Sequence, residues 1–160
     1  MTTFSTANLW DAFGNKCISC ETQFKQYGAV RQFSGPVRTV SCFNDNALLR
    51  QMLNTPSSGE VLIVDGGGSL GAALIGDVTA SLGVKNGWAG VIIYGAIRDA
   101  TQMMLVTLGV KALGTNPKTS TKLGTGEVDV SVSFGGVTFN PGNWVYSDED
   151  GTILSPTQLQ

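Results

Sequence analysis

The stretch VLIVDGGGSLGAALIGDVTASLGVKNGWAGVIIYGAIRD, residues 61–99, decides the fold of this chain. It contains two continuous apolar runs, Val61–Val64 and Val91–Tyr94, each of which ends at a glycine or a charge. Such runs are typical of strands that are buried on both faces. The segment between them, roughly Ala72–Lys85, has the composition of a helix. The order of strand, glycine turn, helix and strand predicts a parallel βαβ crossover.

Three charged residues stand where the ends of this unit are expected to meet. Asp77 opens the helix after Gly76, and Arg98 and Asp99 follow the second strand. Ligands of open α/β sheets bind at the edge formed by the carboxyl ends of the strands. Two interpretations stay open here. One is a salt bridge between Asp77 and Arg98. The other is a site in which Asp99 binds a divalent cation and Arg98 clamps a carboxylate with two parallel N–H donors.

The type of metal follows from the small number of ligands. A cation held by one carboxylate and otherwise by water is typical of Mg²⁺ or Mn²⁺ and poor for zinc. The chain has no histidine, which excludes Ser-His-Asp and Cys-His catalysis and His-ligated zinc. Cys17 and Cys20 have the spacing of a zinc or redox pair, but Cys42 is the one further cysteine. Packing or exposed thiols in a reducing compartment are therefore the favoured interpretation.

The glycine turn DGGGSL, residues 65–70, invites a second hypothesis. Gly66, Gly68 and Gly71 match the dinucleotide pattern G-x-G-x-x-G literally. The acidic residue that should close the second strand is missing, and so is the lysine of a phosphate-binding loop. Nucleotide binding is therefore the weaker interpretation, and backbone amides that line a small anionic pocket are favoured.

Composition limits the classes of function. The 160 residues favour one domain, 1–160, and 42% hydrophobic against 14% charged residues hints at buried subunit contacts. The net charge is −2 and no basic run occurs, so nucleic acid is not expected as a direct ligand. The sequence shows neither an apolar stretch of membrane-spanning length nor a secretory signal, and the expected location is the cytoplasm.

The remaining sequence predicts short helices and strands. Helices are expected near Thr6–Phe13, capped by Thr6 or Asn8, and at Asn46–Asn54, capped by Asp45, with a short helix or turn at Ala100–Leu105. Strands are expected at Val37–Cys42, Leu108–Leu113, Val128–Phe134, Val137–Phe139, Trp144–Tyr146 and Thr152–Leu154, and a polar loop at Gly114–Gly126. The predicted class is α/β: β/β/α layers with the parallel βαβ unit, a small β-barrel-like sheet and C-terminal β-hairpins.

Five segments carry a resemblance to a known family: CFNDNALLR, VLIVDGGGSLGAALIGD, NGWAGVIIYGAIRDA, GTNPKTSTKLG and FGGVTFNPGNWVYSDEDG. Together they resemble the family named for the regulator of ribonuclease activity A, which also contains the class II 4-hydroxy-4-methyl-2-oxoglutarate aldolases. The resemblance covers about Asp11 to Pro156. It implies a homotrimer of β/β/α subunits with active sites at the subunit interfaces.

Within that family, the aldolases carry Asp, twenty residues, then Arg-Asp, whereas members known only as regulators lack the second aspartate. Asp77, Arg98 and Asp99 match the aldolase pattern. By this resemblance, Asp99 would bind Mg²⁺ or Mn²⁺ largely through waters, and Arg98 would hold the substrate carboxylate and the leaving pyruvate. Asp77 would orient or deprotonate a metal-bound water, and the backbone of Gly76, Asp77, Val78 and Thr79 would line the substrate. The longer aldolases add an acidic residue from a neighbouring subunit, which this shorter chain does not reveal.

Two functions follow as hypotheses. The first is a metal-dependent aldolase that cleaves 4-hydroxy-4-methyl-2-oxoglutarate to two pyruvates and decarboxylates oxaloacetate at the same enolate-stabilising site. The alternative is a regulator that binds an RNA-degrading endonuclease of the ribonuclease E type and inhibits it. The Arg98-Asp99 pair favours the enzyme.

Overall fold

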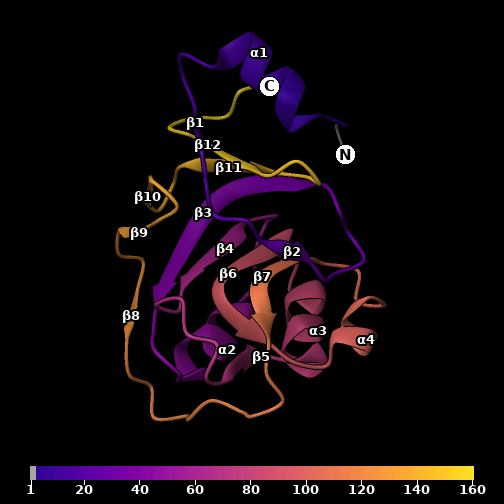
Figure 1. Cartoon of the computed structure of the whole chain (residues 1–160), viewed down its shortest axis with the longest axis vertical. Helices are drawn as coiled ribbons and strands as arrows, with labels where there is room; N and C mark the ends of the chain where they lie inside the picture. Colours follow the sequence, from indigo (N-terminus) through magenta and orange to yellow (C-terminus); the bar gives the residue numbers. More distant parts are fainter. Residues whose placement is uncertain (1–2) are drawn as a thin grey trace.

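A computed structural model describes residues 3–160 and shows a mixed α/β fold (Figure 1). The helices are α1 (Thr6–Phe13), α2 (Ala47–Leu53), α3 (Asp77–Lys85) and α4 (Ala100–Met103). The strands are β1 (Ile18–Ser19), β2 (Lys25–Gln26), β3 (Phe33–Ser41), β4 (Val61–Asp65), β5 (Ala73–Ile75), β6 (Gly90–Ile97), β7 (Gly109–Thr115), β8 (Glu127–Val128), β9 (Val132–Phe134), β10 (Val137–Phe139), β11 (Trp144–Ser147) and β12 (Thr152–Ser155).

The main sheet has ten strands and is open. Eight strands follow the order β1-β12-β11-β3-β4-β6-β7-β2, with β5 attached to β6 and β8 to β3, while β9 and β10 form a separate hairpin. The predicted mixed α/β class is confirmed. Because the path ends at β1 and β2, the sheet that was expected to resemble a barrel is not closed.

The predicted layers are visible in Figure 1, where β11 and β12 lie above β4, β6 and β7, and α2, α3 and α4 lie below them. The side chains of β4 explain why this strand lies between two layers. Val61 and Ile63 face the apolar cluster between the two sheet layers, whereas Leu62 and Val64 face the cluster that contains the helices. All four are fully buried. Successive side chains of a strand point to opposite faces of the sheet. A strand whose side chains are apolar on both faces must therefore be covered by a layer on each side.

Strand β3 joins the two layers. Its first half, Phe33–Pro36, pairs antiparallel with β11, and its second half pairs parallel with β4 from Val37 onward. The sequence predicts a strand only from Val37, because glycine and proline in Ser34-Gly35-Pro36 are typical of turns. Pro36 instead occupies the last position of the antiparallel pairing. A methyl group on Gly35 would lie 2.0 Å from the Gly59 carbonyl oxygen, so the close approach requires glycine.

The central unit contains one strand more than predicted. Strands β4 and β6 pair in parallel, as expected. The segment Ala73–Ile75, predicted as the start of a helix, is instead β5 and pairs in parallel with β6. The helix α3 begins only at Asp77. A short apolar run can form either a helix or a strand, and here its pairing with β6 makes it a strand.

The C-terminal third contains the expected antiparallel pairs, β9 with β10 and β11 with β12. The strand predicted over Val128–Phe134 is interrupted at Asp129, whose φ of 54° lies in the left-handed region. Its carboxylate pairs with Arg38 of β3, with oxygens 2.8 and 2.7 Å from two guanidinium nitrogens. We call residues 116–131, between β7 and β9, the strap. In Figure 1 the strap runs below the helices and rises along one side of the sheet.

Cys17, Cys20 and Cys42 are free thiols and are buried, so of the two expected alternatives the structure shows packing rather than exposed thiols. Burial, together with the nearby charges of Asp45 and Asp65, raises the pKa of Cys42 to about 12, which keeps this thiol protonated at neutral pH. None of the helices within residues 3–160 is long and apolar enough to cross a membrane.

Candidate active site at the edge of the parallel sheet

A pocket of about 130 Å³ lies where β5 and β6 end and α3 begins. This is the edge at which the sequence predicted a site. The lining residues are Asn46, Arg50, Ala73, Ile75, Gly76, Asp77, Val78, Thr79, Arg98, Asp99, Thr119 and Lys122. Every predicted site residue is among them. The volume is below the range of about 300–1,000 Å³ typical of drug-sized ligands, so the pocket suits a small acid.

The position of Asp99 is fixed by its backbone. Its φ of 58° and ψ of 43° are left-handed, which is uncommon for a residue with a side chain but is tolerated by aspartate. The Arg98 N–H donates to the Ile75 carbonyl at 3.0 Å, and the Asp99 carbonyl accepts from Met103 N–H at 2.8 Å. Asp99 is thus held between β5 and α4, in a strained conformation of the kind found at functional sites.

The Asp99 carboxylate touches the start of α3. Its Oδ2 accepts from the Asp77 backbone N–H at 3.2 Å and lies 3.9 Å from Arg98 Nε. A methyl group added at Gly76 would lie 2.3 Å from the same Oδ2. The φ of Gly76, −123°, would suit any residue, so the approach of Asp99 is what requires glycine there.

Asp77, Val78 and Thr79 form the first turn of α3. Backbone N–H groups in this turn have no acceptor within the helix, and the helix dipole favours negative charge at this end. Thr79 is buried, and its hydroxyl accepts from Arg50 at 3.2 Å. The alternative salt bridge between Asp77 and Arg98 is not among the ion pairs of residues 3–160, in which Arg98 instead lies nearest to Asp99.

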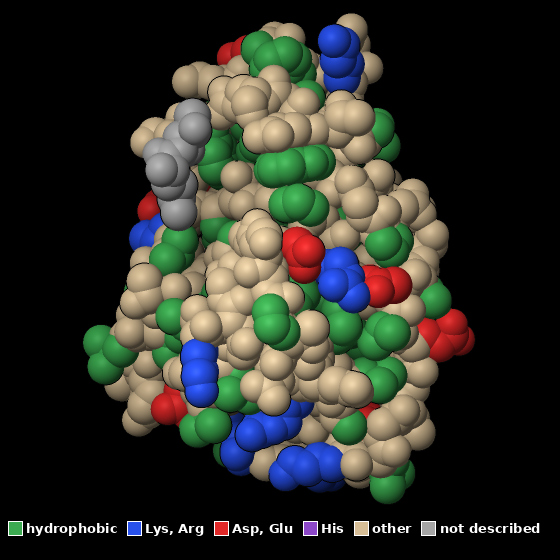
Figure 2. Space-filling view, turned by 180° about the vertical axis from the view of Figure 1, so that it is seen from behind, with side chains coloured by type: hydrophobic (Ala, Val, Ile, Leu, Met, Phe, Trp, Pro, Cys, Tyr) green, Lys and Arg blue, Asp and Glu red, His purple; other side chains and the backbone are tan. Residues whose placement is uncertain are grey.

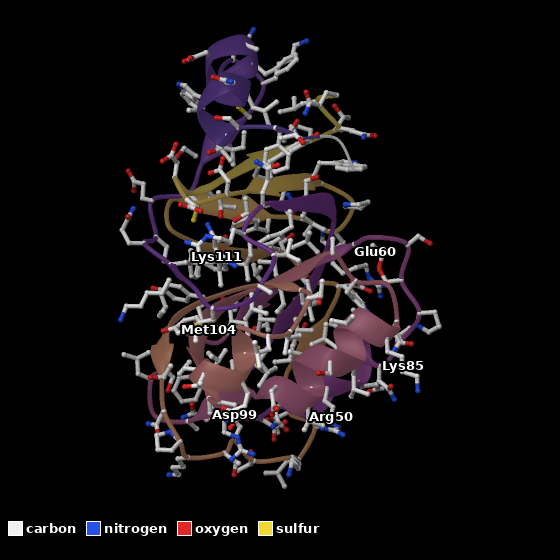
Figure 3. The ribbon with its side chains drawn as sticks, turned by 90° about the vertical axis from the view of Figure 1, so that its right-hand side faces the viewer. Arg50, Glu60, Lys85, Asp99, Met104 and Lys111 are labelled. Carbon is white, nitrogen blue, oxygen red and sulfur yellow. The ribbon has the colours of Figure 1, made fainter. Side chains whose placement is uncertain are left out.

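The sequence missed two basic residues of the pocket. Arg50 comes from α2 and Lys122 from the strap. Figure 3 shows Arg50 and Asp99 at the same end of the molecule, and Figure 2 shows Lys and Arg side chains gathered at the lower end of the back face. Neither Arg50 nor Lys122 has an ion-pair partner among the described residues. Both stood in segments that carried the family resemblance, but only the packing of α2 and the strap brings them to the pocket.

The glycine turn, in contrast, does not line this pocket, and the expectation of an anionic pocket formed by its amides is wrong. The N–H groups of Gly66 and Gly68 donate to the Tyr94 carbonyl, and that of Gly67 donates to the Asp65 carboxylate. Those amides are therefore occupied. The turn also leads into β5 rather than into a helix, so a nucleotide cradle is not formed either.

The carboxylates of the pocket fit a weakly held, water-rich cation. Within residues 3–160 no group of three or more His, Cys, Asp or Glu side chains could hold a metal ion. Zinc sites need such a group, whereas Mg²⁺ keeps several waters and takes one or two carboxylates. The glycine at position 76 leaves room for the Asp99 carboxylate at this spot. Among the described residues, the two carboxylates of the pocket, Asp77 and Asp99, are too few for a structural zinc site and match the number that a water-rich cation takes.

Comparisons with known proteins agree with this fold. The RraA-like family model, described as Aldolase/RraA, matches residues 6–154. A Geobacillus kaustophilus structure named S-adenosylmethionine: 2-dimethylmenaquinone methyltransferase has 46% identity and a TM-score of 0.96, covering 98% of this chain and 97% of its own. The RNA-processing inhibitor RraA from Thermus thermophilus has 41% identity and a TM-score of 0.95, with 99% and 96% covered. Streptomyces coelicolor RraAS2, of the RNase ES inhibitor RraA family, has 27% identity and a TM-score of 0.74, with 94% and 77% covered. This chain therefore belongs to the RraA-like family.

Proposed function

We propose that this protein is a divalent-metal-dependent aldolase that cleaves 4-hydroxy-4-methyl-2-oxoglutarate to two pyruvates and also decarboxylates oxaloacetate. The observation that carries the proposal is the convergence of Asp77, Arg98 and Asp99 on one small pocket. Arg50 and Lys122 add positive charge to the same pocket, which favours an anionic substrate. The pocket is too small for the nucleoside of S-adenosylmethionine, so methyl transfer is not proposed.

In this proposal Asp99 holds Mg²⁺ or Mn²⁺. The bound cation supplies Lewis-acid stabilisation of the negative charge that develops on the 2-oxo oxygen. Arg98 binds the adjacent carboxylate with two parallel N–H donors and retains the pyruvate product. The N–H groups of Val78 and Thr79 face the same negative charge, because the first turn of α3 lines the pocket.

Asp77 is the proposed base. Its carboxylate takes the proton of the substrate 4-hydroxyl, directly or through a water. The C3–C4 bond then breaks, C4 becomes the ketone of one pyruvate, and the electron pair remains on C3 in the enolate of the other. That enolate becomes the second pyruvate when C3 takes a proton, which Asp77 returns directly or through a water. In oxaloacetate the bond to the departing CO₂ breaks instead and leaves the same enolate. No Schiff-base lysine is needed, and Lys85 is the last residue of α3, whereas Asp77 is its first.

The test is pyruvate release from both substrates with Mg²⁺, with Mn²⁺ and with EDTA. We expect EDTA to abolish turnover and Asp99→Ala to lower it by at least about a hundredfold, as for a displaced reacting group. Asp150→Ala, in an exposed turn beside β12, serves as a control with the same loss of charge. Wild-type turnover by Asp99→Ala would refute the assignment.

We further propose that the protein acts as a homotrimer in the cytoplasm, with its active sites at subunit interfaces. Val78 lines the pocket and is 62% exposed, and Met104 and Leu105, which follow α4, are 60% and 83% exposed. Exposed apolar side chains of this size, one of them at the pocket, favour a subunit contact. Analytical ultracentrifugation tests the trimer, and a monomer at micromolar concentration would contradict it.

A second candidate function is inhibition of an RNA-degrading endonuclease by protein contact. It is favoured by 41% identity to the Thermus RNA-processing inhibitor RraA, and the sequence pI of about 4.9 suits a basic, RNA-binding partner. A pull-down with such an endonuclease and an RNA cleavage assay test this role. Undiminished RNA cleavage at micromolar protein would count against it.

A further inference from the structure

Asp45 forms an unusually complete buried hydrogen-bond site just outside the pocket. Its side chain is 1% exposed. The carboxylate accepts from the Thr121 hydroxyl at 2.7 Å, the Leu123 N–H at 2.6 Å, the Gly124 N–H at 3.1 Å and the Ala47 N–H at 3.2 Å. Burial alone would raise the pKa of Asp45, but these donors outweigh it and lower the pKa, so the group is ionised at neutral pH.

The four donors belong to the two segments that carry the missed basic residues. Ala47 is the first residue of α2, which presents Arg50, while the other three donors are in the strap and flank Lys122 on both sides. Backbone bonds join the same segments: Asn46 N–H donates to the Thr121 carbonyl at 2.9 Å, and Thr121 N–H donates to the Asn44 carbonyl at 2.9 Å.

Apolar burial does not hold the strap in this region. Lys122 is exposed, and Leu123 is 79% exposed. Ser120 is buried and donates its hydroxyl to the Ala73 carbonyl at 2.7 Å, but none of the side chains of residues 121–124 is buried. These four residues keep their position through hydrogen bonds, and bonds to an ionised acceptor are the strongest of these. Removing the charge of Asp45 would leave two backbone N–H groups of the strap without a strong acceptor.

We propose that Asp45 is a positioning residue for the pocket: it fixes the strap to α2 and thereby holds Lys122 beside Arg50, as a pair that receives a second anionic group of the substrate. The anchoring of Lys122 stands on the contacts above, while its consequence for the substrate rests on the proposed function. Asp45 does not line the pocket and so acts only through the residues it holds.

The experiment compares Asp45→Asn with Asp148→Asn. Asp148 is a matched control because its carboxylate also accepts several bonds, from Thr6 N–H at 2.7 Å, from the Thr6 hydroxyl at 2.6 Å and from Asp150 N–H at 3.0 Å, but ties α1 to the turn between β11 and β12. Limited trypsin digestion reports on the strap, because trypsin cuts after Lys122. Steady-state decarboxylation of oxaloacetate, a dicarboxylate, reports on the pocket.

For Asp45→Asn we expect cleavage after Lys122 to accelerate at least tenfold, and KM for oxaloacetate to rise about tenfold with kcat within a factor of two. Asp148→Asn should change neither quantity. Combining Asp45→Asn with Lys122→Met should raise KM no further than Lys122→Met alone, because the two act in series. Thr121→Val, which removes one donor and keeps the charge, should give a smaller change in the same direction, and it decides the question if Asp45→Asn does not fold.

An unchanged cleavage rate in Asp45→Asn, a fall in kcat without a rise in KM, or additive effects with Lys122→Met would each overturn the proposal. Absence of wild-type turnover on any oxo acid is a different result, because it refutes the proposed function. The cleavage rate after Lys122 then decides alone whether Asp45 anchors the strap.

Discussion

Replacing Gly76 by alanine tests the site without removing any charge from it. The backbone conformation of Gly76 is one that alanine also adopts, so the added methyl group affects the protein only through the atoms that it contacts. It would lie 2.3 Å from Asp99 Oδ2, 3.3 Å from Asp99 Cγ and 3.4 Å from Arg98 Cγ. An ordinary contact begins near 3.4 Å, so the Asp99 carboxylate has to move by about 1 Å.

The cost to stability is expected to be small. The displaced atoms are the end of a flexible side chain, and what is lost is the bond from the Asp77 N–H at 3.2 Å. A partly exposed bond of this kind contributes about 1 kcal/mol. In a protein of this length, that lowers the melting temperature by about 2–4 °C. The effect on catalysis is much larger, because misplacement of a reacting group by 1 Å can lower the rate by about a hundredfold.

The assay is Mn²⁺-dependent pyruvate release from oxaloacetate, read beside a thermal melt. Gly71→Ala is the matched control: the same methyl group would lie 3.4 Å from Ser69 Oγ, outside the pocket, and both readouts should stay near wild type. Wild-type turnover by Gly76→Ala would show that catalysis does not depend on the position of the Asp99 carboxylate. That result would refute the role inferred from the close contact between Gly76 and Asp99.

Arg98→Lys should raise KM for oxaloacetate about tenfold, because lysine lacks the two parallel donors of the guanidinium; a KM within a factor of two by the same assay would contradict a bidentate role. Gly109→Ala should lower the free energy of unfolding by about 3 kcal/mol in urea, since the methyl group would lie 2.2 Å from the buried ring of Phe33, and a loss below about 1 kcal/mol would disagree with this packing. Stability should also fall at acid pH: hydrogen bonds from Arg38 hold the pKa of Asp129 below its usual range, so this contribution is present above about pH 4 and is lost as the pH falls through the folded-state pKa. Urea titrations from pH 6 to pH 3 should show this fall, and less of it in Asp129→Asn.

The sequence predicted the centre of the fold well because its signal is local there. The strands β4 and β6 are uninterrupted apolar runs, and such runs occur only where both faces of a strand are covered. The error in the crossover has a physical cause as well. Ala73–Ile75 is apolar enough for a helix or a strand, and only the partner strand β6, more than twenty residues away, selects the strand.

The residues of the site likewise fall into those that local sequence predicts and those that depend on distant partners. Asp77, Arg98 and Asp99 were found because a parallel crossover must bring the start of its helix and the end of its second strand to one edge. Arg50 was missed because its place in the pocket depends on how α2 packs, and Lys122 because it belongs to the strap, which has no periodic pattern. The tie that brings them together is Asp45, predicted only as a helix cap. Its carboxylate does accept from Ala47 N–H at 3.2 Å, but its other bonds go to residues 76 to 79 positions away.

The two candidate functions require different residues, so a substitution can affect one function and leave the other unchanged. Catalysis needs the recessed groups, above all the Asp99 carboxylate in its left-handed backbone position. Inhibition by contact needs the exposed ones, such as Met104 and Leu105, and places no demand on a strained aspartate. Strain of this kind costs stability of about 1–3 kcal/mol and persists where it serves a function. Asp99→Gly would relieve the strain and, on this reasoning, should stabilise the fold while abolishing turnover and leaving any endonuclease inhibition intact. A variant that loses inhibition together with turnover would mean that both activities use the pocket.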